Sequence, residues 1–277
     1  MHADELRQIA DIAAQAEAAD GAAPLDEATW LALRHRSDDV AAWVDPDGFA
    51  LLVERDLSLV VRPSARRKGV GARLLGTALA ERSTVEAELR AWSHTDHPGA
   101  ARLAERHGFA RVRELWVMRR PTSLPAGEVV VPEGVTIRPY RRGDEDELLR
   151  VNAAAFAFHP EQGAMTRDDL AERMAEPWFD PSGLLVAHRG RGLLGFHWTK
   201  QHSATLGEVY VVGIDPAAQG TGLGRALTRA GLLHLAGRGI TEVLLYVEAD
   251  NEPAVRLYTT HGFTHSAQDT HVMYRRT

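Results

Sequence analysis

Alternation of apolar and polar positions predicts short strands and amphipathic helices along the second half of the chain. The predicted strands are 135–140, two strands about an Arg-Gly turn within 183–200, 207–215, 242–249 and a final hairpin ending in VMYRR. The predicted helices are 144–156, 166–175 with Thr166 as N-cap, one from about Gly222 and one from about Glu252. Because the early strands follow one another and only the middle is strand–helix–strand, we expect a mostly antiparallel α+β sheet flanked by helices.

The chain contains two divergent copies of one unit. The stretch 57–79 matches 209–231, with Pro63 aligned on Pro216 and Gly69 on Gly222, and 90–109 matches 244–263. The segment 121–134 is rich in Pro and Gly and reads as a linker. A length of 277 residues suits two domains, which we place at 1–120 and 135–277.

A glycine-rich turn precedes a predicted helix in both copies. In IDPAAQGTGLGRAL (214–227), Arg225 stands where a dinucleotide fingerprint needs its third glycine, and neither copy has the Gly-Lys-Ser/Thr of a phosphate-binding Walker loop. Both copies share a basic or amide residue, two spacers, Gly, one spacer, Gly and a helix. Backbone amides and a helix N-terminus suit a pyrophosphate there, and the alternative is a strand-to-helix loop without a ligand.

Composition narrows the possible chemistry. The absence of cysteine excludes disulfides, thiolate metal sites and a cysteine nucleophile. A net charge of −6 gives no reason to expect nucleic acid or an anionic membrane as partner. The sequence has no secretory signal pattern, so we expect a cytoplasmic protein, and a monomer. His94 and His97 align with EADN (248–251) of the other copy, so we expect a loop there and no metal.

The motif V-x-P-x-x-Gln/Arg-x-x-Gly-x-Gly between strand and helix resembles that of the GNAT N-acetyltransferases. The strings LLRVNAAAFAFHPEQG (148–163), LLGFHWTK (193–200), GEVYVVGIDPAAQ (207–219) and LLYVEADNEPAVRLY (244–258) resemble more closely the mycothiol synthases, a tandem family of GNAT proteins. The resemblance implies two GNAT domains and acetyl transfer from acetyl-CoA to the cysteinyl amine of desacetylmycothiol, a cysteinyl-glucosaminyl-inositol. It also implies that the N-terminal domain binds acetyl-CoA without catalysing.

Amine acetylation needs a base for the nucleophile and an acid for the departing thiolate. In the second copy Glu208 and Tyr258 can supply them, whereas the aligned residues of the first copy are Arg55 and Ala104. Glu208 is alternatively a polar strand opening, on the face of Tyr210 and Val212 by alternation, and Tyr258 a half-buried aromatic. We expect direct transfer in a ternary complex, because cysteine and a G-x-S-x-G elbow are both missing.

The resemblance also implies contacts with the acceptor. They fall on residues of both halves, namely Glu27, Glu161, Lys200, Glu208 and Tyr246. From the residues alone, Glu27 reads as an acid at a helix N-terminus, Tyr246 as a core residue, and Lys200 as an exposed end of a strand that shares a face with Trp198.

Contacts with acetyl-CoA are expected at equivalent positions of both copies. In the second copy they are Val212, Gly213, Ile214, Gln219, Gly220, Thr221, Gly222, Leu223, Gly224, Arg225, Asn251, Glu252, Pro253, Ala254, Val255 and Arg256. In the first copy they are Leu59, Val60, Val61, Arg67, Lys68, Gly69, Val70, Gly71 and Ala72. The stretch between Val40 and Val61 departs from the family, because it leaves little room for the usual strands.

Two other function classes fit the same residues. An acetyltransferase for another small amine or a protein N-terminus would use the same acetyl-CoA machinery. A non-catalytic acyl-CoA sensor would keep the glycine turns alone, and the presence of Glu208 and Tyr258 argues against it.

Overall fold

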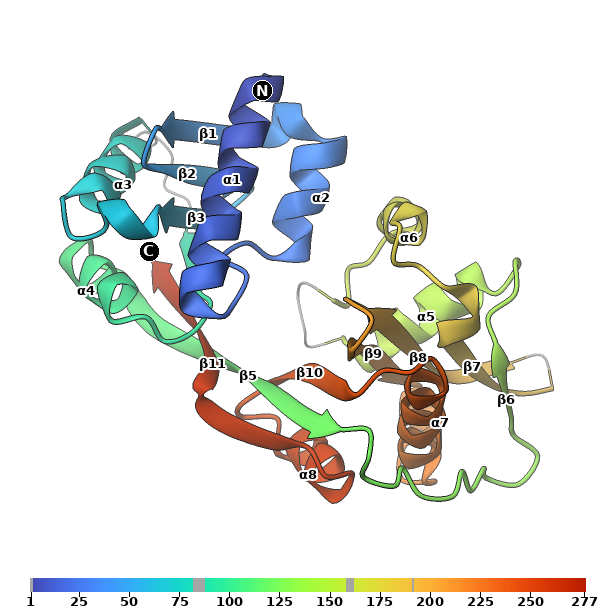
Figure 1. Ribbon diagram of the computed structural model, residues 1–277. Helices are drawn as coiled ribbons and strands as arrows, with labels where there is room; N and C mark the ends of the chain where they lie inside the picture. Colours follow the sequence, from blue (N-terminus) through green and yellow to red (C-terminus); the bar gives the residue numbers. More distant parts are fainter. Residues whose placement is uncertain (1, 82–87, 158–161, 191) are drawn as a thin grey trace. The chain divides into compact units, whose positions relative to one another are not determined.

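A computed structural model describes residues 2–81, 88–157, 162–190 and 192–277. The chain forms two compact units (Figure 1). Unit 1 comprises residues 1–116, 248–250 and 266–277, and unit 2 comprises 117–247 and 251–265. The compact units therefore interleave along the chain, whereas the division into 1–120, 121–134 and 135–277 follows the sequence repeat and stays a prediction.

Unit 1 is a mixed sheet with helices on both faces. Its helices are α1 (Ala3–Asp20), α2 (Glu27–His35), α3 (Val70–Glu81) and α4 (Pro98–Arg106). Its strands follow the order β1 (Val40–Asp45), β2 (Gly48–Val53), β3 (Asp56–Val61), β4 (Leu89–Ser93) and the end of β11 (Thr264–Arg276). Only β3 and β4 run parallel among the pairs recorded in this unit.

Alternation along β2 explains why both faces of unit 1 are covered. Phe49 and Leu51 pack in a core built with α1 and α2, and Ala50 and Leu52 pack in a second core built with α3. Successive side chains of a strand point to opposite faces, so one apolar run fills both cores. Figure 1 shows α1 and α2 on one side of β1–β3 and α3 on the other.

The expectation that the stretch between Val40 and Val61 is too short for the usual strands is wrong. Three antiparallel strands fit there, because β1 and β2 are joined by two residues and so are β2 and β3. Glu54, in the second turn, has φ 54°, the positive value that tight hairpin turns require.

Unit 2 repeats this architecture. Its helices are α5 (Glu145–Ala155), α6 (Arg167–Ala175), α7 (Leu223–Gly237) and α8 (Glu252–Thr260). Its strands follow the order β5 (Ala110–Pro121), β10 (Glu242–Glu248), β9 (Leu206–Ile214), β8 (Gly192–Gln201), β7 (Leu184–Arg189) and β6 (Thr136–Pro139). The mostly antiparallel α+β fold is confirmed, as is Thr166 as the N-cap of α6.

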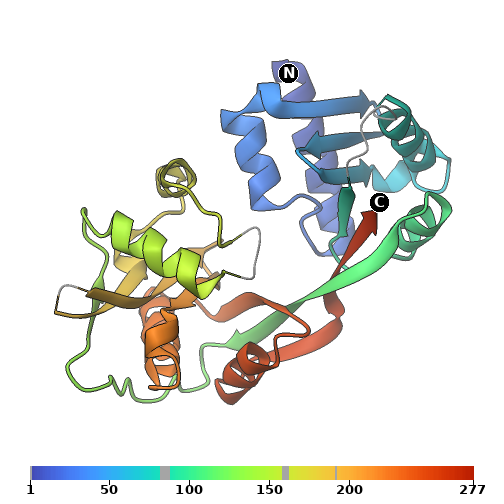
Figure 2. The ribbon, with the colours of Figure 1, turned by 180° about the vertical axis from the view of Figure 1, so that it is seen from behind.

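The two faces of β8 meet different helices. Phe196 and Trp198 are buried in a core with α5 and α6, as their shared face in the sequence predicts. His197 points the other way, to α7, where its Nδ1–H donates to the carbonyl of Leu227 at 2.8 Å. Figure 2 shows α5 and α7 on opposite faces of this sheet.

The predicted C-terminal hairpin is wrong. Residues 264–276 form one long strand, β11. Its last residues pair antiparallel with β4 of unit 1, from Val272 opposite Ser93 to Arg276 opposite Leu89. Its neighbour in unit 1 thus lies about 180 positions earlier in the chain, and local sequence patterns carry no signal for such a pairing. In the described part of the chain no helix is both long and apolar enough to cross a membrane.

Gly231 of α7 is expected to tolerate no side chain. A Cβ at this position would lie 2.0 Å from the buried His197 ring. We expect Gly231→Ala to lower the free energy of unfolding by about 3 kcal/mol through overpacking. Gly237→Ala, in the same helix with open space around it, should be neutral or stabilising. Urea denaturation of both variants tests this, and equal stabilities would contradict it.

Protonation of His197 is expected to destabilise the fold at acid pH. Burial lowers its pKa to about 4, against about 6.5 in the unfolded chain. The folded state then binds fewer protons between pH 4 and 6.5, so stability falls as the pH drops through this window, by up to about 3 kcal/mol. Urea denaturation at pH 7, 5 and 4 measures the loss. His197→Asn, which cannot titrate, should show a shallower pH dependence, and an unchanged slope would refute the assignment.

Candidate functional site

The parallel strands β9 and β10 separate part-way along their length. Their pairing runs from Leu206 opposite Glu242 to Val209 opposite Leu245 and stops there. Each strand nevertheless continues, β9 to Ile214 and β10 to Glu248. Within the described ranges, no strand is recorded as pairing with the β10 side of β9 beyond Val209. An extended chain carrying amides, such as pantetheine, can pair with them as an added strand does.

The glycine turn follows the free end of β9. Gly220 and Gly222 have φ of 74° and 87°, which other residues adopt only with strain. Added Cβ atoms would meet nothing within 4 Å, so backbone conformation, and not packing, selects glycine. Gly222 is the N-cap of α7, whose first-turn amides lack intrahelical acceptors and carry roughly half a positive charge. This turn suits a pyrophosphate.

A β-bulge at Tyr210 corrects the face predicted for Val212. Trp198 pairs with Val211 but Thr199 pairs with Val209, which leaves Tyr210 as the extra residue. Glu208 pairs with Lys200, and Val212 pairs with His197. Paired residues lie on the same face of a sheet. Glu208 therefore lies on the Trp198 face and Val212 on the opposite face, towards α7, because the bulge reverses the alternation.

Glu208 is buried beside a histidine. Its side chain is only 7% exposed, and its Oε2 accepts a hydrogen bond from Nε2 of His202 at 2.7 Å. A carboxylate only accepts, so the proton of this bond belongs to the imidazole. His202 was not predicted as a site residue. The signal was present in the sequence, because a tight connection between the β8 and β9 strands brings positions 202 and 208 together.

Tyr258 lies in α8 with its ring against Phe263, 5.9 Å between centroids. Burial raises the pKa of its hydroxyl to about 12, so the phenol stays protonated at neutral pH. No hydrogen-bond partner is recorded for this hydroxyl among the residues that the structure describes. A protonated hydroxyl without a protein acceptor is suited to donate to a departing thiolate.

Comparisons with known proteins show the family of this chain. The Acetyltransferase (GNAT) family matches residues 150–263, and an Acetyltransferase (GNAT) domain matches 26–111. A mycothiol acetyltransferase from a Nocardioides species is 60% identical, over 99% of this chain and 98% of its own. Another from Thermomonospora curvata is 51% identical, over 97% and 93%. The chain belongs to the mycothiol acetyltransferase family. It is an acyltransferase, and the predicted resemblance is confirmed.

Solved structures show the same tandem GNAT fold. A tandem GNAT protein from the clavulanic acid biosynthesis pathway has a TM-score of 0.74 at 19% identity, covering 99% of this chain and 94% of its own. A GCN5-related N-acetyltransferase from Sphaerobacter thermophilus has a TM-score of 0.69 at 23% identity, covering 97% and 91%. GNAT acetyltransferases use acetyl-CoA as co-substrate. Its place at the open strand pair and glycine turn of unit 2 stays a prediction.

Other residues that we expect to contact acetyl-CoA have packing or capping roles in this member of the mycothiol acetyltransferase family. A Cβ on Gly213 would lie 2.5 Å from the Phe196 ring, so close packing requires this glycine. Asn251 caps α8 by accepting from the amide of Ala254 at 3.2 Å. Arg256 pairs with Glu252 one helical turn away. Contact of these residues with acetyl-CoA stays a prediction.

Lys200 is held by aromatic rings. Its Nζ lies 4.5 Å from the centroid of Trp178 and 5.2 Å from that of Tyr210. The bulge places Tyr210 where its ring can meet this lysine, and neither aromatic was predicted as part of the site. Tyr246 lies on β10 just beyond the last pair with β9 and is 44% exposed, so the reading of a core residue is wrong.

The two remaining acceptor contacts, Glu27 and Glu161, stay predictions. Glu27 is the first residue of α2 in unit 1, behind the N-cap Asp26, as its reading as a helix N-terminal acid predicts. Glu161 lies outside the described residues.

Unit 1 retains the form of the glycine turn but alters its surroundings. The pairing of β3 with β4 ends at Leu57 opposite Ala91, and Gly69 has φ 84°. Arg67 takes the place of Gly220 with φ 64°. Arg66 bonds the carboxylate of Asp20 at 2.6 and 2.7 Å and donates from Nε to the carbonyl of Val61 at 3.2 Å. The Val61 carbonyl ends the strand edge that is expected to contact acetyl-CoA. It already accepts a hydrogen bond from Arg66.

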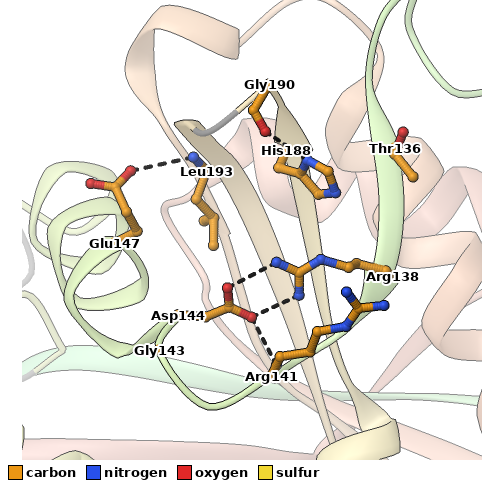
Figure 3. A pocket seen from close by; sticks show the side chains of 9 residues that line it. All are labelled: Thr136, Arg138, Arg141, Gly143, Asp144, Glu147, His188, Gly190 and Leu193. Atoms are coloured by element: carbon orange, nitrogen blue, oxygen red, sulfur yellow. Dashed lines mark hydrogen bonds and ion pairs between the residues drawn. The ribbon is translucent and has the colours of Figure 1, made fainter.

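Unit 2 also contains a cavity of about 560 Å³ (Figure 3). Strands β6 and β7 and the start of α5 line it, and Arg138 there forms a bidentate pair with Asp144 at 2.7 and 2.8 Å. None of its lining residues belongs to the predicted site. Across the described ranges no group of three potential metal ligands is found.

Proposed function

We propose that this protein acetylates the cysteinyl amine of desacetylmycothiol from acetyl-CoA, the last step of mycothiol biosynthesis, as a cytoplasmic monomer. One observation carries the proposal. The buried Glu208 and the protonated Tyr258 accompany the open strand pair and glycine turn of unit 2, while Arg55 and Ala104 stand at the aligned positions of unit 1. Both units therefore have a glycine turn, but only unit 2 has a candidate acid and a candidate base beside it in the sequence.

Glu208 is the general base in this mechanism. The acceptor is an α-amine with a pKa near 8, so roughly a tenth is neutral at pH 7 and a carboxylate suffices to collect the remaining proton. The amine nitrogen attacks the thioester carbonyl carbon directly, forming the amide without an acyl-enzyme. The proton leaves the nitrogen for Glu208, directly or through water.

Backbone and phenol stabilise the other charges. Amides of β9 beyond Val209 that face the gap polarise the thioester carbonyl as its oxygen becomes negative. The C–S bond then breaks, and Tyr258 transfers its proton to the CoA thiolate. The pyrophosphate lies at residues 219–225, and the pantetheine runs along residues 212–214.

Side chains on the Glu208 face select the acceptor. Lys200, which the Trp178 and Tyr210 rings hold, and the exposed Tyr246 offer a donor and a hydroxyl for the sugar hydroxyls of the substrate. Glu27 and Glu161 are assigned to the same substrate by family resemblance. In unit 1, residues 59–61 and 67–72 are proposed to bind a second acetyl-CoA without turnover.

An assay of acceptors tests the proposal. Purified protein with acetyl-CoA is given desacetylmycothiol, an aminoglycoside or a peptide with a free N-terminus, and CoA release and product mass are followed. We expect efficient turnover with the cysteinyl amine only. Preference for another amine would establish a different acceptor, and binding of acetyl-CoA without any turnover would favour an acyl-CoA sensor. Mass spectrometry of the intact complex counts the acetyl-CoA molecules bound.

A further inference from the structure

We propose that His202 carries the proton away from Glu208 to solvent after each transfer. This inference rests on the proposed function, because it concerns the proton that amine acetylation leaves on the base. Glu208 must lose that proton before the next turnover, yet its side chain is almost inaccessible to water.

The contacts of Glu208 point to one exit. The recorded hydrogen bond of its carboxylate, within the described part of the chain, is the 2.7 Å contact with Nε2 of His202. The His202 side chain is 33% exposed, so its ring joins a buried oxygen to bulk water. The charged group opposite Glu208 in the strand register is Lys200, and its ammonium lies over the Trp178 ring. An ammonium group cannot take up a further proton, whereas imidazole can.

The local fold holds the imidazole in place. His202 follows β8, and its backbone amide donates to the carbonyl of Leu206 at 2.9 Å, which closes the turn into β9. Ser203 in the same turn accepts from the amides of Thr205 and Leu206. A turn fixed by three hydrogen bonds gives the ring little freedom to leave the carboxylate.

Proton balance closes in three steps. After Glu208 is protonated, exchange with water moves the single imidazole proton from Nε2 to Nδ1. Nε2 then accepts the proton of the carboxylic acid, and the Nδ1 proton of the resulting imidazolium leaves to water, so that one proton in total passes from Glu208 to solvent. Imidazole suits such a relay because one ring nitrogen can accept a proton while the other donates one. Both side chains return to their starting state, with Nε2–H bonded to Oε2.

Two substitutions of His202 distinguish proton transfer from simple hydrogen bonding to Glu208. His202→Gln can still donate a hydrogen bond to Glu208 but cannot carry a proton, and His202→Ala does neither. We expect both to lower kcat at least about 10-fold with the KM for acetyl-CoA unchanged. Free imidazole added to His202→Ala should restore turnover in proportion to its concentration. His188 lies on β7 outside the proposed site. The control variant His188→Ala should keep the wild-type rate, and added imidazole should not change that rate.

The outcomes are distinct. Wild-type turnover in His202→Gln, or a slow His202→Ala that imidazole does not rescue, would show that the residue only supports Glu208 and would overturn the relay. Thermal unfolding of each variant excludes a folding defect. If the wild-type protein itself fails to acetylate desacetylmycothiol, the proposed function fails. If it turns over and both His202 variants match it, only the relay fails.

Discussion

Glu208→Gln is expected to lower kcat for acetyl transfer by about 10²–10⁴-fold, with little change in the KM for acetyl-CoA. Glutamine has nearly the same shape, and its amide oxygen can still accept from Nε2 of His202 as the carboxylate does at 2.7 Å. The substitution therefore removes the basicity of the group and leaves its packing in place. Steady-state rates of CoA release at saturating acetyl-CoA measure the loss.

A matched carboxylate serves as control for this prediction. Glu242 opens β10 opposite Leu206 and pairs with Arg119 at the surface. Glu242→Gln makes the same chemical change in the same unit, away from the proposed reacting groups, and should leave kcat within about twofold because surface pairs contribute little. Equal rates for wild type and Glu208→Gln would remove Glu208 from the role of base.

Tyr258→Phe is expected to lower kcat by about 10²–10⁴-fold as well. The hydroxyl, with its pKa raised to about 12 by burial, is a proton donor throughout the neutral range, and phenylalanine keeps the ring contact with Phe263. Only the proton for the thiolate is lost. Binding of acetyl-CoA, measured by calorimetry, should therefore stay the same while turnover falls.

Tyr274→Phe is the control for the phenol. Tyr274 is a buried tyrosine of the unit 1 core, and its hydroxyl has no hydrogen-bond partner among the residues that the structure describes. Removing that hydroxyl should not change turnover. If Tyr258→Phe kept the wild-type rate, CoA would have to leave as the thiolate or take its proton from water, and the proposed acid would be wrong.

The sequence predicted the features that depend on residues close together in the chain. Thr166 caps α6, and β7, β8 and β9 lie where alternation predicts them, because caps and strand faces depend on residues close in the chain. The glycine turn was also predictable, because glycine adopts the positive φ of positions 220 and 222 without strain.

What the sequence alone determined about this protein is its duplicated α+β organisation, its family, and an acid and base in the second copy only. Tertiary structure decided the rest. The bulge at Tyr210 turned Val212 to the opposite face from Glu208, the hairpin brought His202 to that carboxylate, and β11 paired with β4. The bulge and the hairpin depend on the exact register between β8 and β9, which alternation within either strand does not give. The partner of β11 lies about 180 positions earlier in the chain, and no local pattern of the sequence indicates such a pairing.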